Sequence, residues 1–148
     1  MAVFILLCIM SGILPPKTHK QIGVAVITNT EGKILIDRRK ADGEMGGLWE
    51  FPGGKIESGE TIEECIKREI KEELSIEISV GDRLTTIIHD YQSFKVTLYV
   101  HLCQYISGDP QPIECEEIHW VDTSIMDRYQ FPQANAQIIS FLQQRSVN

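Results

Sequence analysis

Three glutamates, Glu69, Glu72 and Glu73, lie close together near the middle of the chain. The surrounding segment, residues 61–74, has apolar side chains at helical spacing, which predicts a helix with one face packed against a sheet. Glu69 and Glu73 fall within that apolar sector, and Glu72 lies at its edge. Carboxylates at this spacing repel one another, and the helix dipole disfavours anions at a C-terminal end. A hard divalent cation, Mg²⁺ or in its place Mn²⁺, would relieve both effects because it takes oxygen ligands.

The segment before this helix decides between a metal site and a solvated acidic helix end. In the solvated alternative, the carboxylates would pair with Arg68 and the neighbouring lysines. Thr61 followed by Glu64 forms a capping box, which predicts where the helix starts. The loop ahead of it, residues 48–60, carries glycines at positions 53, 54 and 59. Because such a loop brings backbone carbonyls close to the carboxylates, we favour the metal site.

The composition limits the classes of protein to which this chain can belong. With 148 residues, 43% of them hydrophobic and 24% charged, it has the size and core of one globular domain. A net charge of −7 argues against direct nucleic-acid binding through a basic face. The four cysteines are far apart and form no C-x-x-C pair, which indicates neither a zinc site nor a disulfide framework. Reduced thiols fit the cytoplasm, and we also expect a monomer that binds no membrane.

An unbroken apolar run occupies residues 2–10. It is too short to span a bilayer. A secretory signal is the alternative, but no Lys or Arg precedes the run and no A-x-A cleavage site follows it. Pro15 and Pro16 then separate it from the first predicted strand. We interpret residues 1–16 as an N-terminal apolar extension and residues 17–148 as the domain.

The remaining chain alternates strand and helix patterns without internal repeats. Short β-branched runs predict strands at residues 22–28, 33–37, 95–105 and 118–121. The first two are joined by Asn-Thr-Glu-Gly at 29–32, which predicts a hairpin turn. Helices are predicted at residues 61–74 and from Pro132 onward. Because strands between helices bury a core in layers, the predicted fold class is α/β.

The spacing from Gly54 onward resembles a known signature. The Nudix box, G-x5-E-x7-R-E-U-x-E-E-x-G-U, is matched by Gly54, by Glu60 and by R-E-I-K-E-E at 68–73. Ser75 stands where the box has its last glycine, which affects the turn leaving the helix rather than the metal ligands. The chain is thus similar to the Nudix hydrolases. The resemblance implies an α/β/α sandwich with a mixed central sheet, and metal-dependent hydrolysis of a nucleoside diphosphate linked to another group.

Outside the box, residues 22–142 resemble the MutT-type branch of this family. Residues 36–42 (IDRRKAD) resemble a segment whose second arginine contacts the nucleotide. Residues 47–54 (GLWEFPGG) resemble a segment whose aromatic ring lies at the base pocket and whose first glycine of the pair gives its carbonyl to the metal. Residues 131–135 (FPQAN) resemble F-P-x-A-N, whose asparagine recognises the base. Glu114 matches an acidic residue of a late loop that approaches the metal.

These matches imply a set of site residues. The implied metal ligands, for Mg²⁺ or Mn²⁺, are Gly53, Glu69, Glu72 and Glu73. The implied substrate contacts are Arg39, Glu50, Phe51, Pro52 and Asn135. The implied catalytic residues are Arg68, Glu69 and Glu114, with the general base left open between the two glutamates. As structural alternatives, Phe51 could be a core aromatic and Asn135 a surface residue, whereas Arg68 could simply hold the acidic cluster together.

The resemblance implies a pyrophosphohydrolase that converts 8-oxo-dGTP to 8-oxo-dGMP and pyrophosphate, which sanitises the nucleotide pool and prevents mutation. Water would attack the β-phosphorus in line while a carboxylate accepts its proton. An amide such as that of Asn135 could distinguish the oxidised base, which has a donor at N7 where guanine has an acceptor. One alternative is a Nudix pyrophosphohydrolase that acts on CTP or modified pyrimidine nucleotides. The other is a noncatalytic nucleotide-recognition domain, a class that usually lacks the box carboxylates.

Overall fold

The structure is a computed structural model that describes residue 12 and residues 16–147. Within these residues, seven strands form one sheet. The strands are β1 (Thr18–Thr28), β2 (Ile34–Arg38), β3 (Trp49–Glu50), β4 (Gly53–Lys55), β5 (Glu77–Asp90), β6 (Phe94–Ser107) and β7 (Glu117–Val121). The helices are α2 (Ile62–Leu74), α3 (Ala136–Val147) and two short 3-10 helices, η1 (Thr123–Arg128) and η2 (Gln133–Asn135). The apolar run at residues 2–10 lies outside the described residues, as does most of the extension proposed for residues 1–16.

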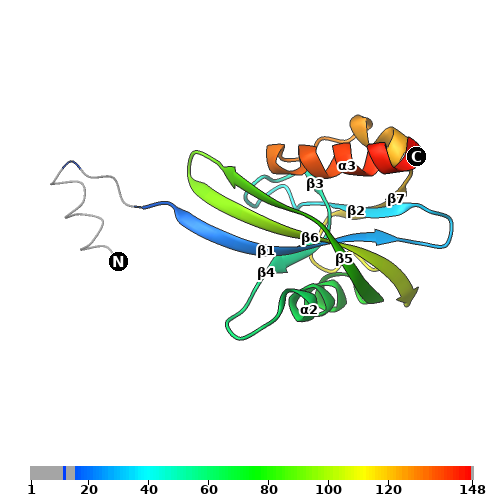
Figure 1. Ribbon diagram of the computed structural model, residues 1–148. Coiled ribbons are helices and arrows are strands. Elements are labelled where there is room, and N and C mark those ends of the chain that lie inside the picture. Colours follow the sequence, from blue (N-terminus) through cyan, green and yellow to red (C-terminus); the bar gives the residue numbers. More distant parts are fainter. Residues whose placement is uncertain (1–11, 13–15, 148) are drawn as a thin grey trace.

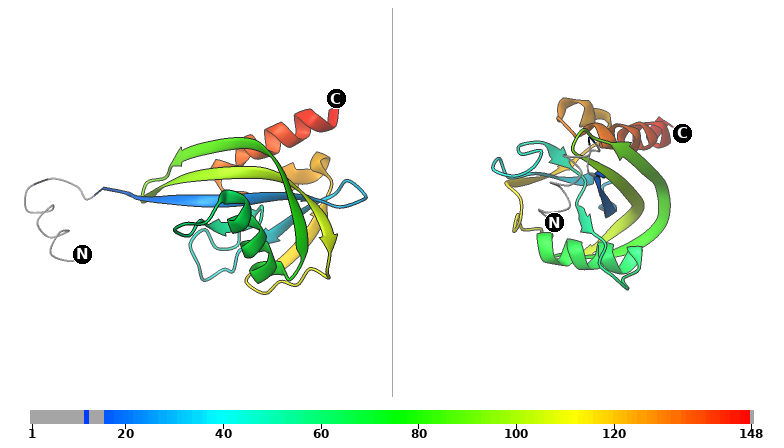
Figure 2. Two further views of the ribbon diagram at one scale, coloured as in Figure 1. Left: turned by 60° about the horizontal axis from the view of Figure 1, so that its bottom comes forward. Right: turned by 90° about the vertical axis from the view of Figure 1, so that its left-hand side faces the viewer.

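The sheet is mixed. Its strand order is β3-β2-β1-β6-β5, with β4 pairing with β1 and β7 pairing with β2. Strands β1 and β6 run parallel from the pair Thr18 and Phe94 to the pair Thr28 and Gln104, whereas β1–β2 and β5–β6 are antiparallel. Helix α2 covers one face of the sheet and α3 covers the other (Figures 1 and 2). The α/β/α sandwich with a mixed sheet is therefore confirmed.

Each face of the sheet has its own hydrophobic core, because successive residues of a strand point to opposite faces. In β1, Ala25 and Ile27 pack with Ile70 of α2. Val24 and Val26 instead contribute to the core that contains Ile138 of α3. Strand β1 is thus buried on both faces from Gly23 to Ile27, which explains why residues 22–27 form a continuous apolar run.

The hairpin predicted at residues 29–32 forms between β1 and β2. The Asn29 carbonyl accepts a hydrogen bond from the Gly32 N–H at 3.0 Å. The Asn29 side chain accepts two more, from the backbone N–H groups of Glu31 and Lys33, each at 3.0 Å. Gly32 has a φ of 77°, a left-handed conformation that glycine adopts without steric cost. The turn residues therefore determine where β1 ends and β2 begins.

The C-terminal helix differs from the prediction in its first turn. Helix α3 begins at Ala136 rather than near Pro132, and η2 occupies the intervening residues. The Asn135 N–H donates to the Pro132 carbonyl at 2.9 Å, which is the three-residue spacing of a 3-10 turn. Asn135 therefore lies at the junction of η2 and α3, not one turn inside an α-helix. In the part of the chain that the structure describes, no helix is long and apolar enough to cross a membrane.

Strand β5 is an element that the sequence analysis does not predict. Its pairing with β6 shifts register between Val80 and Arg83 and again between Arg83 and Thr85. Each shift breaks the alternation of polar and apolar side chains along the strand. The period of two that identifies a strand is therefore interrupted in the middle of β5.

Candidate active site

Helix α2 is held at its start and along its buried face. The Thr61 hydroxyl accepts a hydrogen bond from the Glu64 N–H at 3.1 Å, and the Glu64 carboxylate accepts one from the Thr61 N–H at 2.9 Å. This is the capping box predicted from the sequence. The buried residues of the helix are Cys65, Ile66, Ile70 and Leu74. Their packing fixes the rotation of the helix about its axis, and hence the directions in which its glutamates point.

The three glutamates of the predicted metal site lie in different environments. The Glu69 side chain is 15% exposed, whereas that of Glu72 is 53% exposed. Glu73 is half-buried and lines a cavity. The structure therefore directs Glu69 and Glu73 toward the body of the protein and leaves Glu72 at the solvent edge.

Arg68 joins the helix to the loop that precedes it. Its guanidinium donates to Glu60 at 2.6 and 3.0 Å, to Glu69 at 2.8 Å and to Glu72 at 3.2 Å. The hydrogen bond from Arg68 and one from the backbone of Glu57 lower the pKa of Glu60 to about 2. Hydrogen bonds to Glu60 and Glu69 raise the pKa of Arg68. Arg68 is therefore placed to hold and orient the acidic cluster.

Two glycines allow the loop to approach the helix closely. Gly53 and Gly54 lie in β4, which pairs with β1. A Cβ atom on Gly54 would overlap the Glu69 carboxylate, and a Cβ atom on Gly53 would overlap the backbone carbonyl of Gly23. Glycine is therefore required by space at Gly53, where the obstructing group is backbone, whereas at Gly54 the obstructing group is the end of a side chain that can move. This close approach brings the backbone of β4 against the Glu69 side chain.

A buried aspartate, Asp37, extends the acidic cluster and was not among the predicted site residues. It is 2% exposed and is the cross-strand partner of Glu50. Burial and the neighbouring Glu50 raise the pKa of Asp37 to about 9. Burial, a hydrogen bond with Glu69 and the charges of the other carboxylates raise the pKa of Glu73 to about 10. The one feature of the sequence that indicates Asp37 is its position as a charged residue directly after the apolar run Ile34–Ile36.

The donor set of this cluster fits a hard divalent cation. Glu73 makes no ion pair with a Lys or Arg among the described residues, and its raised pKa shows that negative charge there lacks compensation. Carboxylate and carbonyl oxygens are the ligands that Mg²⁺ and Mn²⁺ prefer. Within residues 12 and 16–147, no three Asp, Glu, His or Cys side chains already form a metal shell. Arg68 instead engages Glu69 and Glu72.

A cavity of about 490 Å³ opens beside the acidic cluster. Carboxylates line one part of it, and the residues are Asp37, Glu50, Glu73 and Glu114. Apolar side chains line another part, and the residues are Val24, Phe51, Phe94, Val96, Leu98 and Ala134. Cavities of this size and mixed lining hold small-molecule ligands. With a cation bound by the carboxylates, the first part would suit an anionic group, and the second part would suit an apolar or aromatic group.

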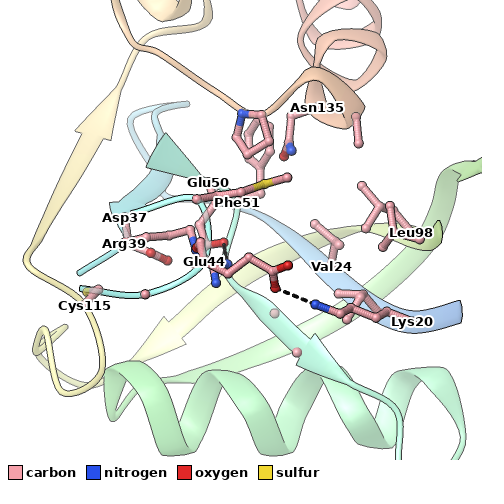
Figure 3. Close-up of a pocket in the computed structure, with 18 of the residues that line it drawn as sticks. Lys20, Val24, Asp37, Arg39, Glu44, Glu50, Phe51, Leu98, Cys115 and Asn135 are labelled. Atoms are coloured by element: carbon pink, nitrogen blue, oxygen red, sulfur yellow. Dashed lines mark hydrogen bonds and ion pairs between the residues drawn. The ribbon is translucent and has the colours of Figure 1, made fainter. Parts of the chain in front are cut away.

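Asn135 and Phe51 lie on the apolar side of this cavity. Asn135 is 8% exposed, and its amide points into the cavity (Figure 3). Among the described residues, nothing is hydrogen-bonded to that amide. Phe51 is 4% exposed and stacks on Phe131, with ring centroids 5.3 Å apart. A buried amide whose donors and acceptor are free is available to a ligand.

The other predicted substrate contacts separate into two groups. Arg39 and Glu50 line the cavity, and the Arg39 guanidinium donates to the Glu50 carboxylate at 2.9 Å. Pro52 is buried and does not line the cavity. Its carbonyl instead accepts a hydrogen bond from the Ala25 N–H at 2.9 Å. Pro52 is therefore placed to hold the segment between β3 and β4 against β1.

Comparison with known proteins is consistent with this geometry. Residues 23–141 match the NUDIX domain family. The chain belongs to the Nudix family. A relative of this Nudix domain is the 8-oxo-dGTP diphosphatase of Escherichia coli K12, with 34% identity over 82% of this chain and 95% of the relative. The CTP pyrophosphohydrolase of the same organism is 33% identical over 78% of this chain and 84% of the relative.

A solved structure resembles this Nudix domain closely. It is the MutT protein from Methanosarcina mazei Go1, with a TM-score of 0.80 and 25% identity, over 90% of this chain and 99% of the other. The MutT-type resemblance found in the sequence is therefore confirmed. The chain is a Nudix hydrolase of the nucleotide diphosphatase type, and enzymes of this family use a divalent metal.

Proposed function

We propose that this Nudix hydrolase converts 8-oxo-dGTP to 8-oxo-dGMP and pyrophosphate with Mg²⁺ as its cofactor and Mn²⁺ as a possible substitute. The observation that carries the preference for 8-oxo-dGTP over dGTP is the free amide of Asn135, which lies at the apolar end of a cavity whose other end is acidic. The similarity to an 8-oxo-dGTP diphosphatase supports the same substrate. Hydrolysis of the oxidised nucleotide would keep it out of DNA, which is how such an enzyme prevents mutation.

The base would be recognised by its pattern of donors and acceptors. Guanine presents N7 as an acceptor, whereas 8-oxoguanine carries a hydrogen on N7 and presents a donor there. The Asn135 amide has one acceptor oxygen and a donor NH₂ group, so it can accept from N7–H and donate to O6 at the same time. Guanine would leave the amide oxygen without a partner in a buried site, at a cost of about 1–3 kcal/mol.

The acidic end of the cavity would carry out the chemistry. Gly53, Glu69, Glu72 and Glu73 would hold the cation, and their oxygen atoms are the appropriate donors. When bound, Mg²⁺ neutralises the triphosphate and makes the attacking water more acidic. Arg68 keeps Glu69 and Glu72 in position through its hydrogen bonds. Glu69 or Glu114 would accept the proton as water attacks the β-phosphorus. The bond from that phosphorus to the bridging oxygen breaks, so 8-oxo-dGMP is the leaving group and the attacked phosphorus, with the water oxygen, ends in pyrophosphate.

A pyrimidine triphosphate is the second candidate substrate. The similarity to a CTP pyrophosphohydrolase, at 33% identity, favours it. An asparagine amide could also pair with the amino group and ring nitrogen of cytosine. The Asn135 amide alone therefore does not choose between the two bases.

We also propose which form of nucleotide the enzyme uses, its oligomeric state and its location. The substrate is a free nucleoside triphosphate rather than nucleic acid, because a net charge of −7 argues against the extended basic face that duplex binding needs, whereas one bound cation can neutralise a triphosphate. We propose that the enzyme acts as a monomer in the cytoplasm and binds no membrane. Sedimentation of the purified protein with and without a DNA duplex tests the monomer and the lack of nucleic-acid binding.

A substrate panel tests the proposed function. The values of kcat/KM are measured for 8-oxo-dGTP, dGTP, CTP and dCTP, with Mg²⁺, with Mn²⁺ and with a chelator. We expect 8-oxo-dGTP to exceed dGTP by at least about tenfold, because one buried hydrogen bond differs between them. The Glu69→Gln variant serves as the inactive control. A preference for CTP over 8-oxo-dGTP would exclude the first substrate and leave the second candidate.

A further inference from the structure

An ion pair crosses the mouth of the nucleotide cavity. Lys20 comes from β1, and Glu44 comes from the loop of residues 39–48 that joins β2 to β3. The Lys20 ammonium lies 2.6 Å from the Glu44 carboxylate, and both side chains line the cavity. Figure 3 shows Glu44 reaching across to Lys20 in front of the cavity. The pair therefore connects the loop to the opposite wall.

Glu44 is also connected to predicted substrate contacts. Its backbone carbonyl accepts a hydrogen bond from the Arg39 Nε at 2.9 Å. The Nη1 of the same arginine donates to the Glu50 carboxylate at 2.9 Å. A continuous set of contacts thus runs from Lys20 through Glu44 and Arg39 to Glu50. Movement of the loop would change the positions of Arg39 and Glu50.

The loop itself needs contacts from outside to stay in place. It leads into β3, which has two residues. Two backbone hydrogen bonds join the ends of the loop, from the Arg39 N–H to the Leu48 carbonyl at 2.9 Å and from the Gly47 N–H to the Arg39 carbonyl at 3.0 Å. The hydrogen bonds nearer its tip are short turns such as Gly43 N–H to the Lys40 carbonyl at 3.3 Å. Met45 has a φ of 55°, a left-handed conformation that is costly for a residue with a side chain. Such a conformation persists where surrounding contacts hold it. Glu44 immediately precedes Met45 in the chain, so its contacts can hold this conformation.

Lys20 is positioned to receive Glu44, yet the pair can open. The Lys20 ammonium lies 4.1 Å from the centre of the Phe94 ring, which attracts a cation to its face. The side chains of Lys20 and Glu44 are 34% and 48% exposed. Ion pairs of this exposure are weak and are screened by salt. A contact of this strength can break to admit a nucleotide and form again over it.

We propose that Lys20 and Glu44 are positioning residues whose ion pair holds loop 39–48 across the cavity and so retains the bound nucleotide. The inference rests on the proposed function in one respect, namely that the cavity takes a nucleotide. The ion pair acts on substrate binding rather than on the chemical step, because neither residue belongs to the acidic cluster on α2.

A charge-exchange cycle tests the ion pair. The proteins are wild type, Lys20→Glu, Glu44→Lys and the double variant, which has the same net charge as wild type. Lys17→Glu is the matched control, because Lys17 pairs with Asp90 at 3.5 Å and does not line the cavity. Two properties are measured: hydrogen exchange of the Gly43, Gly46 and Gly47 amides without nucleotide, and KM and kcat for each triphosphate that wild type hydrolyses.

We expect both single variants to speed exchange in the loop and to raise KM by about three- to tenfold, with kcat changed by less than about twofold. In the double variant, loop exchange and KM should both return most of the way to their wild-type values. Lys17→Glu should match wild type in both. Raising the salt from about 50 to about 500 mM should reduce the differences in loop exchange and in KM between wild type and the single variants.

Two results would overturn the inference. If Lys20 acts only by attracting the polyanion, Lys20→Glu raises KM, Glu44→Lys lowers it, and exchange in the loop stays unchanged. If the double variant is no better than the poorer single variant, the two side chains do not form the contact that matters. Failure of the proposed function is distinguishable, because wild type would then hydrolyse no nucleotide while loop exchange still responded to the charge cycle.

Discussion

The surroundings of Glu73 oppose the ionisation of its carboxyl group. Burial raises its pKa to about 10, with Glu69, Asp37 and Glu50 adding to the effect. A carboxyl whose pKa is raised in the folded state is most stabilising when it is protonated, and its ionisation costs stability as the pH rises. A bound divalent cation reverses this relation, because it favours the ionised form. Glu73 therefore favours metal binding, and its ionisation lowers the stability of the metal-free protein.

The Glu73→Gln variant tests this relation. Glutamine resembles the protonated carboxyl, so the metal-free protein should keep its melting temperature or exceed that of wild type. The rise in melting temperature caused by Mg²⁺ should be lost, and kcat/KM should fall by at least about a hundredfold. Thermal unfolding with and without Mg²⁺, combined with kinetics, measures both effects. Glu63→Gln, at an exposed position in the first turn of the same helix, is the matched control. Unchanged turnover in saturating Mg²⁺ would contradict the metal assignment.

Asn135 is the residue on which substrate selectivity depends. If its amide accepts from N7–H and donates to O6, Asn135→Ala should lower kcat/KM for 8-oxo-dGTP by about ten- to a hundredfold more than for dGTP, at about 1.4 kcal/mol per decade. The affinity for Mg²⁺ should not change, because the amide lies on the apolar side of the cavity. Gln133→Ala, at an exposed position in the same 3-10 helix, is the control. Equal losses for both guanine nucleotides would mean that Asn135 only shapes the cavity.

At the scale of elements, the contact between β4 and α2 brings the backbone of β4 against the Glu69 side chain. The two glycines of β4 meet different obstacles: a Cβ atom on Gly53 would overlap backbone, and one on Gly54 would overlap the Glu69 side chain. Backbone cannot yield without separating the strands, whereas a side chain can rotate. Substitution at these neighbouring positions should therefore have different consequences.

The Gly54→Ala variant should fold and lose activity, because Glu69 must leave its position against β4. We expect a fall in kcat/KM of at least about tenfold with a loss of stability below about 1.5 kcal/mol. Gly53→Ala should instead lower the free energy of unfolding by about 3 kcal/mol or more. Urea denaturation and kinetics on both proteins separate the two effects. Equal stability of the two variants would contradict this difference.

The end of α2 is strained at Ser75, which stands where the Nudix box has its last glycine. Ser75 has a φ of 59°, the left-handed conformation in which helices commonly end with glycine. Its N–H donates to the Lys71 carbonyl at 3.1 Å, so the cap forms despite the strain. Ser75→Gly should raise the free energy of unfolding by about 0.5–1 kcal/mol, measured by urea denaturation. Ser79→Gly, in an extended strand, should lower it. A loss of stability in Ser75→Gly would show that the serine side chain makes a compensating contact.

At the scale of the whole molecule, the site lies where the layers meet. Strands β1, β2 and β4, helix α2 and the turn η2 all contribute residues to one cavity. The long parallel pairing of β1 with β6 supports this arrangement, and it begins at Thr18 and Phe94. A domain that begins at residue 17 stays a prediction, and the pairing of β1 from Thr18 onward is consistent with it.

Deletion of residues 1–16 tests where the domain begins. We expect the shortened protein to keep its kcat/KM and to change its melting temperature by less than about 2 °C, because that change corresponds to less than about 1 kcal/mol for a domain of this size. The measurements are thermal unfolding and kinetics on the full and shortened chains. A large fall in melting temperature would show that the apolar run belongs to the core.

The sequence by itself determined helix α2 and the orientation of its glutamates. The capping box and the apolar sector are short-range features, so the rotation of the helix follows from residues within a few turns of one another. The hairpin at 29–32 was predictable for the same reason, since the Asn29 side chain caps its own turn. The Nudix box and the F-P-x-A-N match named Glu69, Glu73 and Asn135 before any tertiary contact was known.

The tertiary structure alone decided how distant segments meet. Asp37 joins the acidic cluster because β2 pairs with β3 in the register that sets it opposite Glu50. Lys20 meets Glu44 because a loop folds back over β1. Register and loop position depend on packing between segments that the local sequence does not encode. The cavity and the ion pair that crosses its mouth are consequences of that packing, whereas the carboxylates on α2 follow from the local sequence.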